Sequence, residues 1–322
     1  MATQELRDYF TGSTLDDVLR GAVTRILAYG TQIVPSKGPA RELFGVFFEL
    51  TNPRARLSRT ESRGKLFSAL GELCWYLAGS NSGDFIGYYL SVYEKFARNG
   101  IVPDGYGPRL FNWEGVDQIS EVTRRLRRRP VTRKAVVQLF CHTDLHMEHG
   151  EAPCTCTLQF VVRDGRLNML TSMRSSDVHW GLPHDVFALT MLQEIIARDL
   201  GVSLGTYKHV VGSLHLYDEK EPIARRFLNE GWQSTTSAMP PMPAGDPWPG
   251  VTQLLEAESV LRLGGEAADG LSVNGMDPYW ADLVRLLKAF RYRSKTKDED
   301  NARALISEMK CDVYRPYLLG KP

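Results

Sequence analysis

An α+β fold is the class that this sequence predicts, and three observations lead to it. The chain has 322 residues, 43% of them apolar, which is enough to bury a large core in one or two domains. Helix-like and strand-like apolar periodicities both occur, without an internal repeat. Three strand patterns follow one another directly between residues 134 and 175, which favours antiparallel pairing over a doubly wound parallel sheet.

The order of the elements follows from periodicity and from turn residues. Residues 14–29 carry apolar side chains at helical spacing after Ser13 or Thr14, either of which is a suitable N-cap. Asp164-Gly165 is a strong hairpin signal between two strand patterns. The other predictions are strands over 41–52, 134–140, 155–165, 166–175 and 205–218, helices over 64–79, 115–130 and 184–201, a Pro-rich loop over 240–250, and C-terminal helices over 251–263, 278–293 and 298–310.

Charge and cysteine content limit the possible functions. The 39 basic and 38 acidic side chains give a net charge of +1, so the chain as a whole has no strong positive potential that would attract nucleic acid. Any recognition of phosphate must therefore depend on a few local side chains. Five cysteines show no spacing typical of a secreted disulfide framework. The N-terminus is charged and no apolar run approaches about 20 residues. We expect a reduced, cytoplasmic protein without a membrane segment.

Cys154 directly precedes the strand pattern "TCTLQF" (155–160), and its chemistry is ambiguous when it is considered alone. A buried thiol behaves as a small hydrophobe, which is the commonest role of an isolated cysteine in an apolar strand. Cys154 and Cys156 form a C-x-C pair, but no second pair follows at zinc-site spacing, so no metal is expected. The histidines of "HTDLHMEH" (142–149) are read as part of a polar surface loop.

The basic run "RRLRRRPVTRK" (124–134) allows three interpretations. It can bind nucleic acid, form a solvated helix face, or supply a few cations to a single phosphate. The net charge of the chain gives the first interpretation no support. The order of several short motifs decides among these readings.

Six motifs resemble the thymidylate synthase superfamily in both order and approximate spacing. The resemblance spans about residues 36–217. The motifs are "GELCWYLAGSN" (71–81), "DGYGPRLFNW" (104–113), "GVDQISEV" with "RRPVTRK" (115–134), "APCTCTLQF" (152–160), "RSSDVHWGLPHD" (174–185) and "GSLHLY" (212–217). It implies one thymidylate synthase-like catalytic domain over 1–322 with a large mixed sheet flanked by helices, and a divergent helical C-terminal region over 218–322.

The resemblance also implies a role for each matching residue. Cys154 corresponds to the nucleophile that adds to C6 of a pyrimidine, Glu72 to a carboxylate that organises water and proton transfers, and Tyr106 to a member of the proton network. The remaining implied positions bind the nucleotide. Lys37, Arg174 and Ser175 correspond to residues that bind the phosphate, and Arg133 and Lys134 to a basic pair that the partner subunit contributes to the same phosphate. Gln159 and Asp177 correspond to residues that contact the base, and His215 and Tyr217 to residues that contact the sugar. Clustered cations near Cys154 are expected to favour its thiolate.

The clearest departure from the synthase pattern concerns the base. Synthases read uracil with the asparagine of "GLPFN", whereas this chain has "GLPHD", with His184 and Asp185 in the last two positions. An ionised Asp185 accepts from N4 and from a protonated N3 of cytosine, and a neutral one donates to N3 while accepting from N4. The alternative is that Asp185 caps a helix starting at "HDVFALTML".

Aspartate at this position resembles the cytidylate hydroxymethylase branch, most of all the CMP hydroxymethylases of mildiomycin-type nucleoside-antibiotic pathways. The implied reaction joins CMP or dCMP, 5,10-methylenetetrahydrofolate and water to give the 5-hydroxymethyl nucleotide, in a homodimer. The segment "SVYEKFA", with Tyr93 and Phe96, replaces the usual tryptophan-bearing cofactor segment, and Ser176 is placed near the sugar. Alternatives are dCMP as the natural substrate, dUMP methylation, or a non-catalytic nucleotide- or RNA-binding relative.

Overall fold

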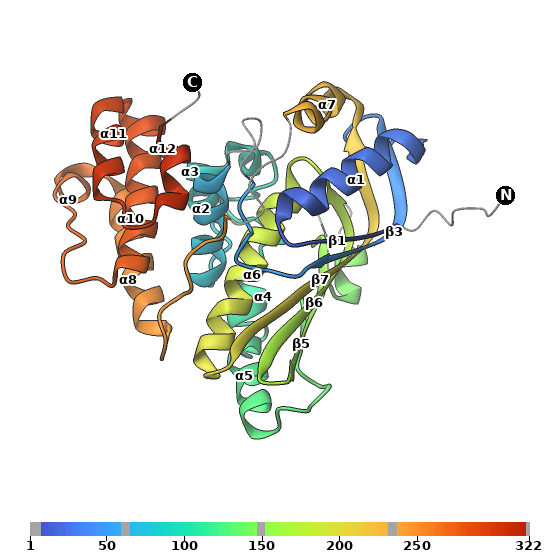
Figure 1. The fold of residues 1–322 in the computed structure, drawn as a ribbon, viewed down its shortest axis with the longest axis horizontal. Coiled ribbons are helices and arrows are strands. Elements are labelled where there is room, and N and C mark those ends of the chain that lie inside the picture. The colour runs from blue at the N-terminus through green and yellow to red at the C-terminus, as the bar shows by residue number, and fades with distance from the viewer. Residues whose placement is uncertain (1–7, 59–64, 147–151, 231–236, 320–322) are drawn as a thin grey trace.

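A mixed seven-stranded sheet forms one side of the molecule in the computed structural model, which describes residues 8–58, 65–146, 152–230 and 237–319 (Figure 1). The strand order is β1-β3-β7-β6-β5-β4, and β2 pairs with β3. The β1–β3 and β6–β7 pairs are parallel and the others antiparallel. The strands are β1 (Tyr9–Gly12), β2 (Thr31–Ile33), β3 (Ala40–Leu50), β4 (Val136–Gln138), β5 (Thr155–Arg163), β6 (Arg166–Asp177) and β7 (Ser203–Tyr217).

Helices cover one face of this sheet. Along β6, alternate residues from Leu167 to Met173 are buried, as the two-residue period of a strand requires when one face meets a core. On β3, by contrast, Phe44 is 82% exposed. The predicted hairpin between β5 and β6 is confirmed, and Asp164 and Gly165 both have positive φ (50° and 68°), the geometry of a tight two-residue turn.

The helical layers follow from the apolar periodicity. Helix α6 is buried along nearly its whole length; it packs on β6 and β7 and against α2, and α2 in turn contacts α8 and α10 (Figure 1). The α-helices are α1 (Leu15–Tyr29), α2 (Leu66–Leu77), α3 (Gly83–Tyr89), α4 (Tyr106–Phe111), α5 (Gln118–Arg128), α6 (Gly181–Asp199), α7 (Glu221–Asn229), α8 (Trp248–Leu263), α9 (Gly265–Asp269), α10 (Pro278–Arg291), α11 (Glu299–Glu308) and α12 (Arg315–Leu318).

The predicted starts of two helices are wrong. Helix α6 begins at Gly181, three residues before the predicted His184, because Pro183 sits in the first turn, where backbone N–H groups need no helical partner. Helix α8 begins at Trp248, inside the predicted Pro-rich loop, because Pro249 occupies the same kind of position. The capping of α1 by Thr14 is confirmed, with Asp17 completing a capping box.

The C-terminal region is helical, as predicted. Helices α8 to α12 form a group beside α2 and α3, on the side of these helices away from the sheet (Figure 1). The mixed sheet with flanking helices confirms the α+β prediction. Among the described residues, none of the helices is long and apolar enough to cross a membrane.

Candidate active site

Backbone hydrogen bonds fix Cys154 just before β5. Its carbonyl accepts from the Arg174 backbone N–H at 2.9 Å, which ties it to β6. The next residue, Thr155, donates its N–H to the Tyr106 hydroxyl at 3.0 Å, so a residue of α4 also holds this segment. Tyr106 stacks on Tyr76, with 5.1 Å between ring centroids. The thiol therefore has a defined position where α4, β5 and β6 meet.

Burial opposes the cations that are expected to favour the Cys154 thiolate. Burial raises the pKa of the thiol to about 11. The Arg174 and Lys37 charges oppose this rise, whereas Asp185 and Asp104 add to it. Desolvation outweighs the two cations, so the thiol is protonated at neutral pH.

Arg174 and Lys37 approach Cys154 from two elements. Arg174, on β6, donates through Nε to the Pro153 carbonyl at 3.0 Å and through Nη2 to the Ala152 carbonyl at 2.6 Å. Lys37 lies in the turn between β2 and β3, and its Nζ is 4.6 Å from the ring centroid of Phe96. Two of the predicted phosphate-binding cations thus gather around the thiol.

The predicted sugar-binding pair lies beside Ser175. The rings of His215 and Tyr217 on β7 meet edge to face, with 5.0 Å between centroids. Nδ1 of His215 lies 3.5 Å from the Ser175 hydroxyl. Asp177 pairs with His215 in the sheet, and its carboxylate accepts from the backbone N–H groups of His179 and Trp180. Asp177 thereby shapes the turn into α6, and its predicted contact with a base stays a prediction.

Three predicted residues lie outside this cluster in the single chain. Arg133 and Lys134 are exposed in the segment between α5 and β4. Gln159 lies on β5 between the buried Leu158 and Phe160, so it occupies the other face of the strand, and its amide donates to the Arg133 carbonyl at 3.3 Å. The roles of these three residues stay predictions.

Glu72 on α2 and Asp185 on α6 bring two carboxyl groups into the same region. Burial and the charge of Glu72 raise the pKa of Asp185 well above its usual range, and the nearby Ser176 hydroxyl opposes this rise. Two nearby carboxyl groups do not both ionise readily, so Asp185 retains its proton to higher pH than an exposed aspartate.

The helix-cap interpretation of Asp185 is wrong. Helix α6 starts at Gly181, so Asp185 lies in its second turn, and no side chain caps the helix. Ser176 is buried, with its Oγ on the Asp185 side. The Ser176 Oγ and the Asp185 Oδ2 both line the space next to Gly181. Each lies 3.6 Å from the position that a Cβ atom would take at this glycine.

His184 is buried, and both of its ring nitrogens have partners. Nε2 lies 2.9 Å from the Ser68 hydroxyl, and Nδ1 lies 2.9 Å from the Trp180 carbonyl. Because burial lowers the pKa of His184, the ring is neutral, with Nδ1–H donating to the Trp180 carbonyl, which can only accept. His184 is therefore held as a structural neighbour of Glu72.

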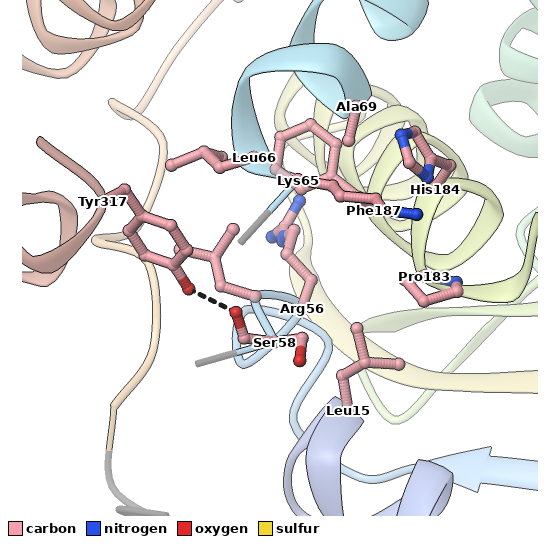
Figure 2. Close-up of a pocket in the computed structure, with 11 residues that line it drawn as sticks. Leu15, Arg56, Ser58, Lys65, Leu66, Ala69, Pro183, His184, Phe187 and Tyr317 are labelled. Atoms are coloured by element: carbon pink, nitrogen blue, oxygen red, sulfur yellow. Dashed lines mark hydrogen bonds between the residues drawn. The ribbon is translucent and has the colours of Figure 1, made fainter. Parts of the chain in front are cut away.

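A small cavity of about 20 Å³ lies behind His184, with room for a single water (Figure 2). Tyr317 of α12 lines its far side and donates to the Ser58 carbonyl at 2.7 Å. Arg56, which also lines the cavity, pairs with the buried Glu194. The C-terminal helical group thus docks directly against the segment that leads into α2.

Sequence reasoning missed two features of this region. Tyr93 donates to Oε1 of Glu72 at 2.7 Å. Trp180 is 44% exposed, and Nζ of Lys65 and of Lys220 both approach its ring face, Lys220 at 5.7 Å from the centroid. The sequence signal for Tyr93 was the segment "SVYEKFA" (91–97), and the signal for Trp180 was its position inside the motif "RSSDVHWGLPHD" (174–185).

The structure gives no support to a metal site among the residues that it describes. Among residues 8–58, 65–146, 152–230 and 237–319, no three His, Cys, Asp or Glu side chains gather as a metal site would require. His142 and His146 lie in the described 3₁₀ segment η2 (His142–His146), while His149 lies outside the described residues.

Comparisons with known proteins identify the family of the chain. The family model for thymidylate synthase matches residues 24–240, so the chain belongs to the thymidylate synthase family. Helices α8 to α12 lie beyond the matched range. A deoxyuridylate hydroxymethyltransferase of Bacillus phage SP01 is 26% identical over 223 residues, which cover 65% of this chain and 58% of the phage protein. The chain thus aligns with less than two thirds of the length of that relative.

Proposed function

We propose that the protein is a cytidylate 5-hydroxymethyltransferase. Its substrates are CMP or dCMP, 5,10-methylenetetrahydrofolate and water, and its products are the 5-hydroxymethyl nucleotide and tetrahydrofolate. The observation that carries the proposal is Asp185, a proton-holding carboxyl in the position where synthases have a base-reading asparagine. The similarity to a hydroxymethyltransferase supports water, and not hydride, as the final reactant.

Asp185 explains both recognition and activation of cytosine. A neutral carboxyl donates to the ring nitrogen N3 and accepts from the N4 amine, which is the pattern that cytosine presents. Transfer of the Asp185 proton to N3 makes C6 more electrophilic toward the Cys154 sulfur. The positive charge of Arg174 stabilises the Cys154 thiolate that attacks C6.

The folate co-substrate supplies one carbon at the oxidation level of a methylene group. Trp180, which is 44% exposed, has the ammonium groups of Lys65 and Lys220 over its ring, at the start of the helix that carries Asp185. A flat aromatic group that bears a carboxylate tail fits a partly exposed ring with two ammonium groups close to it. These residues of the chain would hold the folate next to the base.

A homodimer completes the proposed site. The sheet face opposite the helices carries partly exposed side chains, among them the 82% exposed Phe44, which a second copy of the chain would cover. Arg133 and Lys134, exposed in one chain, would then reach the phosphate of the partner. The tests are the solution mass of the protein and the activity of mixed Cys154→Ala and Arg133→Ala chains: a shared site restores turnover in the mixture, and self-contained sites do not.

The alternatives differ in nucleotide and in chemistry. The phage relative acts, by its name, on deoxyuridylate, which keeps dUMP as a candidate substrate for hydroxymethylation. Methylation of dUMP is the synthase outcome. A nucleotide- or RNA-binding relative without catalysis would keep its affinity after Cys154→Ala, whereas the proposed enzyme loses turnover by several orders of magnitude.

The test incubates the purified protein with methylenetetrahydrofolate and CMP, dCMP, UMP or dUMP in parallel, and identifies each product by mass. The proposal requires cytidylate to gain the mass of CH₂O, with Cys154→Ala inactive as the matched control. A methyl gain on dUMP would refute it. The ratio of CMP to dCMP turnover in wild type and in Ser176→Ala decides whether Ser176 influences the choice of sugar.

A further inference from the structure

Tyr93 lies in the 3₁₀ segment η1 (Ser91–Lys95), next to the catalytic region but outside the predicted nucleotide-binding set. Its ring packs edge to face against Trp75 and Phe96, with 5.5 and 6.2 Å between centroids. These contacts aim the Tyr93 hydroxyl at Glu72, to which it donates at 2.7 Å. The direction of this hydrogen bond is thus set by aromatic packing.

The hydroxyl of Tyr93 is a dependable donor. Burial and the charge of Glu72 raise the pKa of Tyr93 well above its usual range, so the phenol keeps its proton at every pH at which the protein would work. His184, a second polar side chain near Glu72, has its two ring nitrogens occupied by Ser68 and the Trp180 carbonyl. Tyr93 therefore orients Glu72, and His184 does not.

The bond to Tyr93 makes the two oxygens of Glu72 unequal. Oε1 is engaged by the Tyr93 hydroxyl, which leaves the lone pairs of Oε2 for a water molecule. Glu72 is only 4% exposed, so without this bond its carboxylate would have fewer hydrogen bonds in a poorly solvated place. An oriented base in such a place is what selective addition of one water requires.

We propose that Tyr93 is a positioning residue for the water-addition step, an inference that rests on the proposed function. After the one-carbon unit is attached, the pyrimidine carries an exocyclic methylene at C5 and the Cys154 sulfur at C6. The water oxygen bonds to the methylene carbon and its proton passes to Oε2 of Glu72. The electron pair of the exocyclic double bond moves to C5–C6, the C6–S bond breaks, and the released Cys154 thiolate recovers the proton from Glu72.

The test compares Tyr93→Phe with Tyr89→Phe, which is a matched control because Tyr89 also donates to a buried glutamate, Glu258, at 2.9 Å. Cytidylate tritiated at C5 and methylenetetrahydrofolate are supplied in excess, and tritium release and hydroxymethyl product are followed separately. For Tyr93→Phe we expect kcat about ten to a hundredfold lower and KM within about threefold. Tritium release shows a burst of one equivalent per active site, because attachment still precedes the slowed water step.

Tyr89→Phe is expected to keep the wild-type kcat and show no burst. An unchanged kcat in Tyr93→Phe, or an equal loss of tritium release and product without a burst, overturns the positioning role. Circular dichroism and thermal unfolding of both variants exclude misfolding as the cause. If the wild type hydroxymethylates uridylate and not cytidylate, the proposed function fails. The same burst experiment, run with uridylate, then still tests whether Tyr93 positions Glu72 for water addition. If the wild type adds no water to any pyrimidine nucleotide, both ideas fail.

Discussion

Asp185→Asn separates proton donation by Asp185 from base recognition. The amide has nearly the same volume as the acid and still accepts from N4 and donates to N3 of cytosine, so KM for cytidylate should stay within about threefold. The amide cannot transfer a proton to N3. General acid catalysis contributes roughly a hundredfold to ten-thousandfold, so kcat should fall by that factor, or about 3–5 kcal/mol in the barrier.

The structure also fixes the sign of the stability change. A carboxyl whose pKa is raised in the folded state binds more protons there than in the unfolded chain, so its contribution to stability falls as pH rises from about 4 through the raised pKa. Asp185→Asn removes this titration, and the variant should gain stability relative to wild type as pH increases. Denaturant unfolding at pH 5 and pH 8 measures the difference.

Steady-state kinetics with cytidylate and uridylate is the assay for the catalytic part. Glu258→Gln is the control, because Glu258 is another buried carboxyl with a raised pKa, and it lies beside Tyr89 and Arg262. It should keep the wild-type kcat. The ratio of uridylate to cytidylate turnover should rise in Asp185→Asn. A wild-type kcat on cytidylate in this variant would refute the proton-donor reasoning.

Three further predictions concern neighbouring groups. Alkylation of Cys154 by iodoacetamide in the free protein should be slow at pH 7 and accelerate up to about pH 11, and Arg174→Gln should slow it; peptide mass mapping measures the rate, and a plateau below pH 8 would contradict the burial effect. His184→Phe should leave kcat and its pH profile within about threefold of wild type, because the neutral ring is structural; a hundredfold loss would make it catalytic. Lys37→Ala should raise KM for the nucleotide about tenfold or more at constant kcat, and an unchanged KM would remove Lys37 from the phosphate site.

Local periodicity was sufficient to predict most of the fold. The capped helix α1, the Asp164-Gly165 hairpin and the C-terminal helices all depend on neighbouring residues along the chain, which a sequence displays directly. The start of α6 was misplaced because Pro183 was not recognised as an acceptable first-turn residue. That error made the helix-cap interpretation of Asp185 possible.

The sequence predicted that some of the candidate residues lie together, but it did not predict their protonation. The motif order identified Cys154 and Arg174 as partners, and a backbone hydrogen bond joins them. The protonation of Cys154 was missed because desolvation depends on how deeply the packed chain covers the thiol. The bond between Tyr93 and Glu72 needs the packing of η1 on α2, which no local pattern contains.

A crystal structure of the protein with CMP bound tests the central claim most directly. The account predicts that the Asp185 carboxyl lies within about 2.6–3.2 Å of N3 and N4 of the cytosine, and that the Cys154 sulfur lies over C6 at bonding or near-contact distance. A cytosine that turns its amino edge away from Asp185, or a sulfur well beyond contact with C6, would contradict it.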